Sequence, residues 1–187
     1  MVQIQFRFYE TLVESSLLDG VWRLLCLYDS EFIPPLSARE YTYQSNLTVN
    51  ATAGQEPKQY FAALKKQSFL LAMDQEQVVG FMSFRAPYVS EDLNDQMETL
   101  YVTTVIVDKE YRGQGITTQL YAKLEEIAKP RKLPIMTRTW STNDSHIRIL
   151  HKMKMQEVER IENGRGQGID TVYYRQDLQE VRHLYEQ

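Results

Sequence analysis

The feature that most constrains the fold lies in the middle of the chain, where two contrasting patterns follow each other closely. Residues 99–107, "TLYVTTVIV", are apolar and β-branched and are bounded by charge, which is typical of a buried strand. A short loop with two glycines follows at 108–115. Apolar residues then recur at a helical spacing, at Ile116, Leu120, Leu124 and Ile127. A buried strand, a glycine loop and a helix in this order predict an α/β arrangement.

The loop contains the pentapeptide Arg-Gly-Gln-Gly-Ile, which occurs twice, at 112–116 and at 165–169. The first copy opens a helix, where free backbone N–H groups and the helix dipole favour a bound anion. After the second copy, apolar residues recur at every second position, as in a strand, and Asn163-Gly164 precedes it. This context predicts a hairpin turn. The first copy is therefore the candidate phosphate site. Such a junction also occurs for packing alone, so both interpretations of Gly115 stay open here.

Two common phosphate-binding loops do not fit the first copy. The dinucleotide fingerprint requires a third glycine where this chain has Thr118. The mononucleotide loop requires Gly-Lys followed by Ser or Thr, whereas Gly115 is followed by Ile116. Both ligand classes are disfavoured.

The rest of the chain alternates between strand and helix patterns, without a linker that would divide it. We expect an irregular stretch at 41–55, a polar, acidic loop at 86–98 and a connector bracketed by Pro130 and Pro134. Further strands are expected at 2–10, 69–74, 78–85, 135–140, 155–162 and 169–176, and helices at 17–28, at 56–67, after 141–144 and at 178–187.

Composition limits the function classes. The chain has 187 residues, enough for one domain spanning 1–187. Its formal net charge of -4 gives no reason to expect nucleic acid or an anionic membrane as partner. A single cysteine permits no internal disulfide, and no apolar run is long enough to cross a membrane, so we expect a cytoplasmic protein. The three histidines are dispersed, without a spacing that suggests a metal.

The segment "VIVDKEYRGQGITTQLYAKLEE", residues 105–126, resembles the acetyl-CoA signature of the Gcn5-related N-acetyltransferase (GNAT) superfamily. That signature is a strand ending in Val, an acidic turn, Tyr-Arg, and then Arg/Gln-x-x-Gly-x-Gly/Ala opening a helix. Arg112, Gly115 and Thr117 occupy its three positions, with Thr117 in place of the usual Gly or Ala. In element order the resemblance covers about residues 1 to 176.

The resemblance implies an α/β (α+β) fold: one GNAT-like domain with a central mixed, mostly antiparallel, twisted sheet of six to seven strands and about four helices. It implies acetyl-CoA as co-substrate without a metal, and a small-molecule or peptidyl amine as acceptor. Strand exchange or edge pairing through the last hairpin would permit a homodimer. Asn143 would help to anchor the pantetheine arm, and Arg112 would add a charge-assisted contact. The arm would meet the backbone of Val105, Ile106 and Val107, and the pyrophosphate would meet the N–H groups of Gly113, Gln114, Gly115, Ile116, Thr117 and Thr118.

One departure bears on catalysis. Counted from Asn143, the family's frequent general-acid Tyr falls on Leu150, and its Gly-Phe falls on Lys154-Met155. Three hypotheses therefore stay open. The first is an N-acetyltransferase that moves the acetyl group of acetyl-CoA to a primary amine by direct attack in a ternary complex. The second is a non-catalytic CoA-binding or sensor module of the same fold, and the third is an unrelated α/β ligand-binding domain.

A general base is expected near the start of the signature strand. Tyr101 lies near where the family often places a catalytic carboxylate, and Glu98 precedes the strand and would reach in directly or through a water. We predict Glu98 as the base, with Tyr101 second; the alternative is that Glu98 is a solvated charge and Tyr101 a packing residue. A tyrosine after the second pentapeptide, Tyr173 or Tyr174, is a possible substitute for the lost acid.

Overall fold

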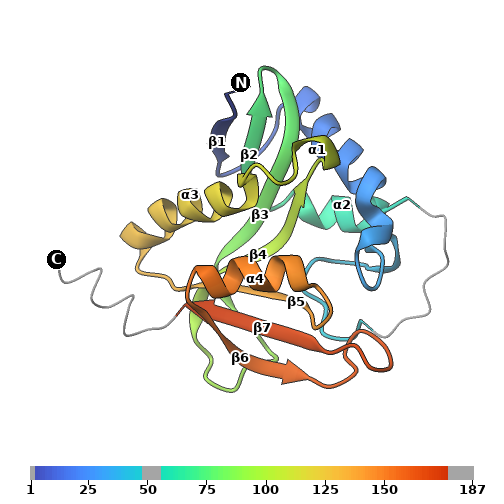
Figure 1. Cartoon of the computed structure of the whole chain (residues 1–187), viewed down its shortest axis with the longest axis vertical. Coiled ribbons are helices and arrows are strands. Elements are labelled where there is room, and N and C mark those ends of the chain that lie inside the picture. Colours follow the sequence, from blue (N-terminus) through green and yellow to red (C-terminus); the bar gives the residue numbers. More distant parts are fainter. Residues whose placement is uncertain (1–2, 48–55, 177–187) are drawn as a thin grey trace. The chain divides into compact units, whose positions relative to one another are not determined.

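The computed structural model describes residues 3–47 and 56–176, and its seven strands form one sheet (Figure 1). The strand order is β1-β2-β3-β4-β5-β7-β6. The strands are β1 Gln5–Tyr9, β2 Ser68–Asp74, β3 Gln77–Val89, β4 Glu98–Val107, β5 Ile135–Trp140, β6 Met155–Ile161 and β7 Thr171–Gln176. The α-helices are α1 Ser15–Tyr28, α2 Lys58–Leu64, α3 Ile116–Arg131 and α4 Asp144–Lys152, and the 3₁₀ turns are η1 Asp29–Glu31, η2 Leu36–Ala38 and η3 Lys109–Tyr111.

The sheet is mixed and mostly antiparallel, as the resemblance implied. β1 with β2, β2 with β3, β5 with β7 and β6 with β7 are antiparallel, whereas β4 pairs with β5 in parallel. The parallel ladder runs from Leu100 opposite Ile135 to Val102 opposite Thr137. The expected α/β sheet with about four helices is thereby confirmed among the described residues.

The described residues group into two compact units. The first comprises 3–44, 56–84 and 103–123, and the second comprises 45–47, 85–102 and 124–176. Each is described by itself below. The expectation that 1–187 form a single domain stays a prediction.

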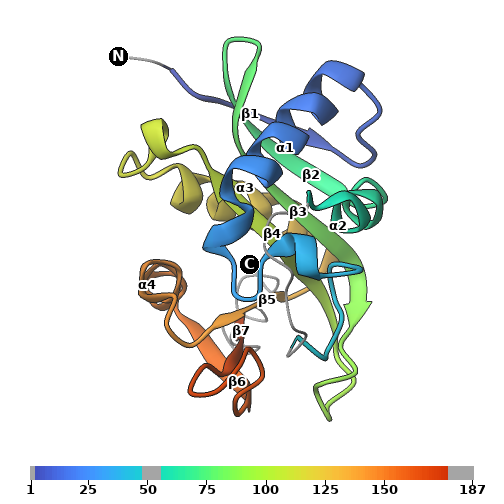
Figure 2. The same cartoon turned by 90° about the vertical axis from the view of Figure 1, so that its right-hand side faces the viewer.

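In the first unit, α1 and α2 cover one face of the sheet. Figure 2 shows both helices on the near side of β2 and β3, with α3 on the far side. The helical spacing of apolar residues in α1 explains this packing, because it places one stripe of side chains toward the strands. The buried cluster joins Val21, Leu24 and Tyr28 of α1 and Tyr60 and Leu64 of α2 to Phe69, Leu71, Phe81 and Ile106 of the strands.

A glycine inside α1 marks the closest approach of that helix to β3. A Cβ built on Gly20 would lie 2.7 Å from Cγ2 of Val78. Atoms at that separation clash, so only glycine lets the helix lie this close to the strand.

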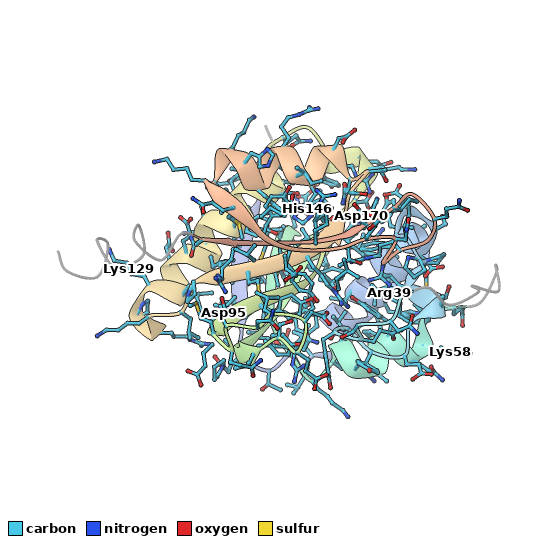
Figure 3. The ribbon with its side chains drawn as sticks, turned by 90° about the horizontal axis from the view of Figure 1, so that it is seen from below. Arg39, Lys58, Asp95, Lys129, His146 and Asp170 are labelled. Carbon is cyan, nitrogen blue, oxygen red and sulfur yellow. The ribbon has the colours of Figure 1, made fainter. Side chains whose placement is uncertain are left out.

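The second unit is built on the β5–β7–β6 ladder. Its buried cluster contains Leu93, Tyr101, Met136 and Tyr173. The acidic loop predicted at 86–98 is shorter than expected, because β3 continues to Val89 and leaves only residues 90–97 as loop. Two of its carboxylates bind the sheet instead of facing only solvent. Tyr173 donates a hydrogen bond to Asp92, and Nη1 of Arg175 lies 2.7 Å from Oδ2 of Asp95, which Figure 3 labels.

The end of α3 also differs from the sequence prediction. The helix runs through Pro130 to Arg131, where the proline was expected to begin a connector. In the last turn of the helix, a proline removes only one backbone hydrogen bond. The positive charges of Lys129, labelled in Figure 3, and Arg131 stabilise the negative end of the helix dipole. Among the residues of 41–55 that are described, 41–47, there is no helix or strand. The helix predicted at 178–187 lies outside the described residues.

A membrane-spanning segment was not expected from the sequence. Across 3–47 and 56–176, none of the helices combines the length and the apolar character that crossing a bilayer requires.

Candidate functional site

The candidate site is the loop between β4 and α3 in the first unit. Gly113 and Gly115 have φ angles of +77° and +76°, in the left-handed region that favours glycine. A Cβ on Gly113 would meet nothing within 4 Å, and one on Gly115 would meet only Nε2 of Gln119, at 3.9 Å. The space beside both glycines is therefore open to a ligand.

The loop presents a row of backbone donors. The first backbone bond of α3 runs from the N–H of Gln119 to the carbonyl of Gly115, at 3.0 Å. Counting only partners in the described part of the chain, the N–H groups of residues 113–118 donate no hydrogen bond. All of these residues except Ile116 are exposed or half-buried. Six unbonded donors at the positive end of a helix dipole suit the oxygens of a phosphate or diphosphate.

The strand that leads into the loop turns part of its backbone away from β3. The N–H of Asp108 donates to the carbonyl of Val79 at 2.8 Å, so the backbone of Asp108 faces β3. In an antiparallel pair this direction alternates, which places the backbone groups of Ile106 toward β3 and those of Val105 and Val107 away from it. Val105 and the N–H of Val107 therefore remain for the backbone contacts expected of a ligand arm, whereas the carbonyl of Val107 accepts from Nε of Arg112 at 2.8 Å. The expected contact of Ile106 with the arm stays a prediction.

Tyr28, at the end of α1, holds the start of the loop. Its hydroxyl donates to Oδ1 of Asp108 and accepts from the N–H of Lys109, both at 2.9 Å. Arg23, one turn earlier in α1, donates from Nη1 to Oδ2 of Asp108 at 3.0 Å. Burial acts to raise the pKa of Asp108, but the hydrogen bonds from Arg23 and Tyr28 outweigh it, and the pKa is lowered. An ionised Asp108 thus fixes the loop to the helix.

Arg112 is bound within the protein. Its Nε donates to the carbonyl of Val107 at 2.8 Å, and its Nη2 lies 2.9 Å from Oε2 of Glu31. Its guanidinium also stands over the ring of Tyr28, 4.7 Å from the centroid. These contacts place a cation beside the row of amides, and the expected contact of Arg112 with phosphate stays a prediction.

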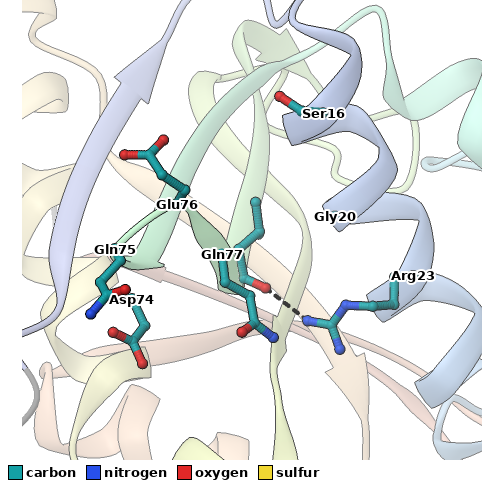
Figure 4. A pocket seen from close by; sticks show the side chains of 8 residues that line it. Ser16, Gly20, Arg23, Asp74, Gln75, Glu76 and Gln77 are labelled. Carbon is teal, nitrogen blue, oxygen red and sulfur yellow. Dashed lines mark hydrogen bonds between the residues drawn. The ribbon is translucent and has the colours of Figure 1, made fainter.

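A hollow of about 550 Å³ lies elsewhere in the first unit, beside the turn between β2 and β3 (Figure 4). Two of its charged side chains are already bound: Nη2 of Arg23 donates to the carbonyl of Val78 at 2.9 Å, and Asp74 accepts from the hydroxyl of Tyr111 at 2.7 Å. The loop amides, which have no such partners in the described residues, are the stronger candidate site.

The two predicted catalytic residues lie in different environments in the second unit. Glu98 is exposed at the first position of β4. Tyr101 is 1% exposed and stacks on Tyr88 with ring centroids 4.7 Å apart, within the cluster that includes Met136. The packing role considered for Tyr101 accounts for this burial. Between the two, Glu98 is the one accessible to an acceptor.

Leu150, which occupies the position of the family's usual acid, is fully buried in α4. The tyrosines considered as substitutes are poor acids here. Burial raises the pKa of Tyr173, whose hydroxyl already donates to Asp92, and burial also raises the pKa of Tyr174. Neither environment favours release of a proton near neutral pH.

Asn143 caps α4 in the second unit. Its Nδ2 donates to Oγ1 of Thr139 at 3.0 Å, and its carbonyl accepts the first helical hydrogen bond, from Ile147. Its side chain is thereby oriented by β5. The described ranges contain no group of three or more side chains that would form a metal site.

Sequence reasoning missed two contacts that fix the loop to α1 and η1: that of Tyr28 with Asp108 and that of Glu31 with Arg112. The helical period of α1 indicated that Tyr28 is on its buried face, but no local pattern links it to Asp108, 80 positions later. The only sequence signal for this contact was Asp108 itself, the acidic residue after the strand, to which the family signature assigns no function.

The sequence model of the Acetyltransferase (GNAT) family matches residues 27–154. No curated protein matches the chain. Several solved structures share its fold at low identity. An N-acetyltransferase from Staphylococcus aureus Mu50 is 17% identical, with a TM-score of 0.66 over 94% of this chain and 99% of that one.

Two further structures are similar to the same extent. The ribosomal-protein-alanine N-acetyltransferase from Brucella melitensis is 17% identical, with a TM-score of 0.64 over 92% of this chain and 98% of that one. Arabidopsis thaliana NAA60, in complex with a bisubstrate analogue, is also 17% identical, with a TM-score of 0.63 over 92% and 97%. At these identities the likeness shows the fold.

Proposed function

The chain belongs to the acetyltransferase (GNAT) family, and we propose that it moves the acetyl group of acetyl-CoA to a primary amine on a small molecule or peptide. The observation that carries this proposal is the row of six N–H groups at residues 113–118 that find no acceptor within 3–47 and 56–176, beside two glycines that leave open space. Family membership accounts for acetyl transfer in general. The amine acceptor and the course of the reaction are the proposed part.

The loop fits the diphosphate of CoA by chemistry as well as by shape. Unbonded backbone donors stabilise phosphate oxygens at a helix start, and a side chain at Gly113 or Gly115 would occupy the space that a ligand needs. We assign the backbone of Val105 and the N–H of Val107 to the pantetheine arm, because they turn away from β3 and the carbonyl of Val107 is bonded to Arg112. The contact of Asn143 with that arm stays a prediction.

We propose direct transfer with both substrates bound. The amine nitrogen forms a bond to the acetyl carbon while the carbon–sulfur bond breaks, so the amine loses a proton and the sulfur leaves as a thiolate. Removing the proton is the larger demand: an amine with pKa near ~10.4 is neutral in only about 4 of 10,000 molecules at pH 7, a cost of roughly 4.6 kcal/mol. The thiolate, with a pKa near ~8.5, departs from its favoured form by only about 2 kcal/mol.

This arithmetic explains how transfer proceeds without an acid at Leu150. Protonation of the leaving thiolate is the smaller of the two free-energy costs, so it needs less catalysis than removal of the amine proton. Holding the amine and the thioester together lowers the barrier by several kcal/mol through proximity. The bisubstrate analogue on the Arabidopsis protein of the same fold supports simultaneous binding as a mode open to this scaffold. Glu98 is the proposed base, because it is exposed, whereas Tyr101 is buried.

The test is thiol release from acetyl-CoA with a panel of amines, with mass detection of the acetylated product. We expect turnover with at least one amine class. Glu98→Gln is expected to lower kcat by about 100-fold, within the range of general-base contributions, and to leave the Kd for CoA unchanged. Glu162→Gln, an exposed charge on the β6–β7 turn, is the matched control.

Two outcomes would decide against the proposal. Binding of CoA without turnover on any amine would favour the sensor module, which has the same loop. Equal activity of the Glu98→Gln and Glu162→Gln variants would remove Glu98 from catalysis but leave the transfer reaction in place.

A further inference from the structure

A carboxylate lies between two cations of the loop, both of which precede the row of amides. Oε1 of Glu31 is 3.2 Å from Nζ of Lys109, and Oε2 is 2.9 Å from Nη2 of Arg112. Lys109 precedes the row of amides and Arg112 directly adjoins it. Glu31 therefore occupies the kind of position, between two cations beside unbonded donors, that an anionic ligand would take.

The position of Glu31 is set by the segment that carries it. α1 ends at Tyr28, and the η1 turn follows with Glu31 as its last residue. Asp29 fixes that turn, because its carboxylate accepts from the N–H of Ser37 at 2.6 Å and from the Ser37 hydroxyl at 2.8 Å. The Glu31 side chain is thus presented to the loop by a hydrogen-bonded turn.

The two cations share one aromatic surface. Nζ of Lys109 lies 5.9 Å from the centroid of the Tyr28 ring, and the guanidinium carbon of Arg112 lies 4.7 Å from it. Two like charges over one ring repel each other, and a carboxylate between them relieves the repulsion. Burial acts to raise the pKa of Glu31, but the hydrogen bonds from Arg112 and then Lys109 prevail and lower it. Glu31 is therefore an anion at neutral pH.

We propose that Glu31 competes with the diphosphate of CoA for Lys109 and Arg112 and so limits the affinity of the loop for the cofactor. This inference rests on the proposed function, since it assumes that CoA binds at residues 113–118. With Glu31 in place, its carboxylate cancels one of the two positive charges and holds both cations, so the backbone amides supply most of the attraction. Without it, two positive charges act on the diphosphate in addition to the amides.

The same competition acts on the product. Free CoA carries the same phosphates as acetyl-CoA, so a residue that weakens phosphate binding also speeds the release of CoA after transfer. Glu31 is in this sense an affinity-determining residue and not a catalytic one, because it touches the cations and not the reacting atoms.

The test compares CoA affinity of the native chain with that of Glu31→Gln by titration calorimetry. We expect the Kd to fall roughly 3- to 10-fold at low salt, the size of one or two exposed charge contacts. The gain should shrink as salt rises, because exposed charges are screened within about 10 Å at 0.1 M ionic strength. Glu110→Gln is the matched control, with the same change of charge one residue from Lys109.

The control is informative because the Glu110 carboxylate makes no hydrogen bond or ion pair with the described residues. If the loss of any nearby negative charge were enough, both variants would bind CoA more tightly to the same extent, which would overturn the proposal. We expect Glu110→Gln to change the Kd by less than about twofold. In an Arg112→Gln background, Glu31→Gln should gain less than in the native chain, because one of the two released cations is gone.

The outcomes also separate this inference from the proposed function. If the native chain binds CoA and Glu31→Gln binds it no more tightly, the inference is wrong and the function stands. If the native chain binds no CoA at all, the proposed function fails, and this inference fails with it.

Discussion

The two Arg-Gly-Gln-Gly-Ile segments use identical residues in opposite ways. At the first copy the amides of 113–118 have no partner in the described chain. The second copy uses its amides to close its own turn. The N–H of Arg165 donates to the carbonyl of Ile169, and the N–H of Ile169 donates to the carbonyl of Gly166. Asn163 accepts from the other two amides, with its carbonyl from Gly166 and with its Oδ1 from Gly168.

The arginines of the two copies also differ, in their exposure and in their contacts. Arg112 is exposed, and its charge lies beside the open amides. Arg165 is 6% exposed, donates from Nε to Oγ1 of Thr171 at 3.0 Å and stands 5.9 Å from the ring centroid of Trp140. One arginine is exposed beside the candidate phosphate site, and the other is buried within a turn.

The conformation of the second glycine in each segment does not separate the copies. Gly115 and Gly168, the fourth residues of the two segments, have φ angles of +76° and +78°. Both glycines are needed for a left-handed backbone, whether or not a ligand binds. What separates the copies is the element that follows. A helix leaves its first N–H groups unbonded, and a hairpin strand does not.

The largest expected effect is on CoA affinity. Gly115→Glu places a carboxylate and a bulky side chain at the amide row, so steric and charge conflict should weaken binding by more than about 100-fold. Gly168→Glu is a control matched in substitution and in backbone strain, since the two φ angles are nearly equal. We expect it to change the Kd less than about twofold.

Both variants should lose a similar amount of stability, on the order of 1–2 kcal/mol from the left-handed backbone. Calorimetry and thermal unfolding together measure the two quantities. A large loss of affinity in Gly168→Glu, or unchanged affinity in Gly115→Glu, would reverse the assignment of the two copies.

The next effect is on stability and concerns the residue before the second copy. A Cβ on Gly164 would lie 2.7 Å from Oγ1 of Thr171 and 3.1 Å from the carbonyl oxygen of Ile161. Gly164→Ala should therefore destabilise the fold by about 1–3 kcal/mol through overpacking. Gly113→Ala, with nothing within 4 Å of its Cβ, should cost only the strain of its positive φ, about 1 kcal/mol. Equal unfolding midpoints for the two variants would contradict this contrast.

Much of the fold could be predicted from the sequence because the spacing of apolar residues in each strand or helix is a local pattern. The strands at Ile135–Trp140 and Thr171–Gln176 and the helix after Gly115 follow from patterns within single segments. The errors lie where a local signal was overridden. Pro130 is tolerated in the last turn of α3, and β3 extends through Pro87, in spite of the polar residues that suggested a loop.

The candidate site divides in the same way. The amide row follows from a strand, a glycine loop and a helix that are adjacent in sequence. The contacts of Tyr28 with Asp108 and of Glu31 with Arg112 join residues about 80 positions apart, and no pattern in the chain indicates them. The burial of Tyr101 against Tyr88 likewise depends on the pairing of strands and not on the period of one.

The smallest expected effect is a pH dependence of the turn at the second copy. Asp170 accepts from the N–H of Asn163 at 2.9 Å and from Nη1 of Arg160 at 2.7 Å, and these two bonds, in that order, lower its pKa. A lowered folded pKa contributes stability that is present above the unfolded value, near ~3.9, and is lost as the pH falls through the folded one. Protection of the amides of Gly166 and Gly168 against hydrogen exchange, relative to their intrinsic rates, should therefore fall below about pH 4. Asp170→Asn should abolish this loss of protection, whereas a pH response that persists in the variant would assign it to another group.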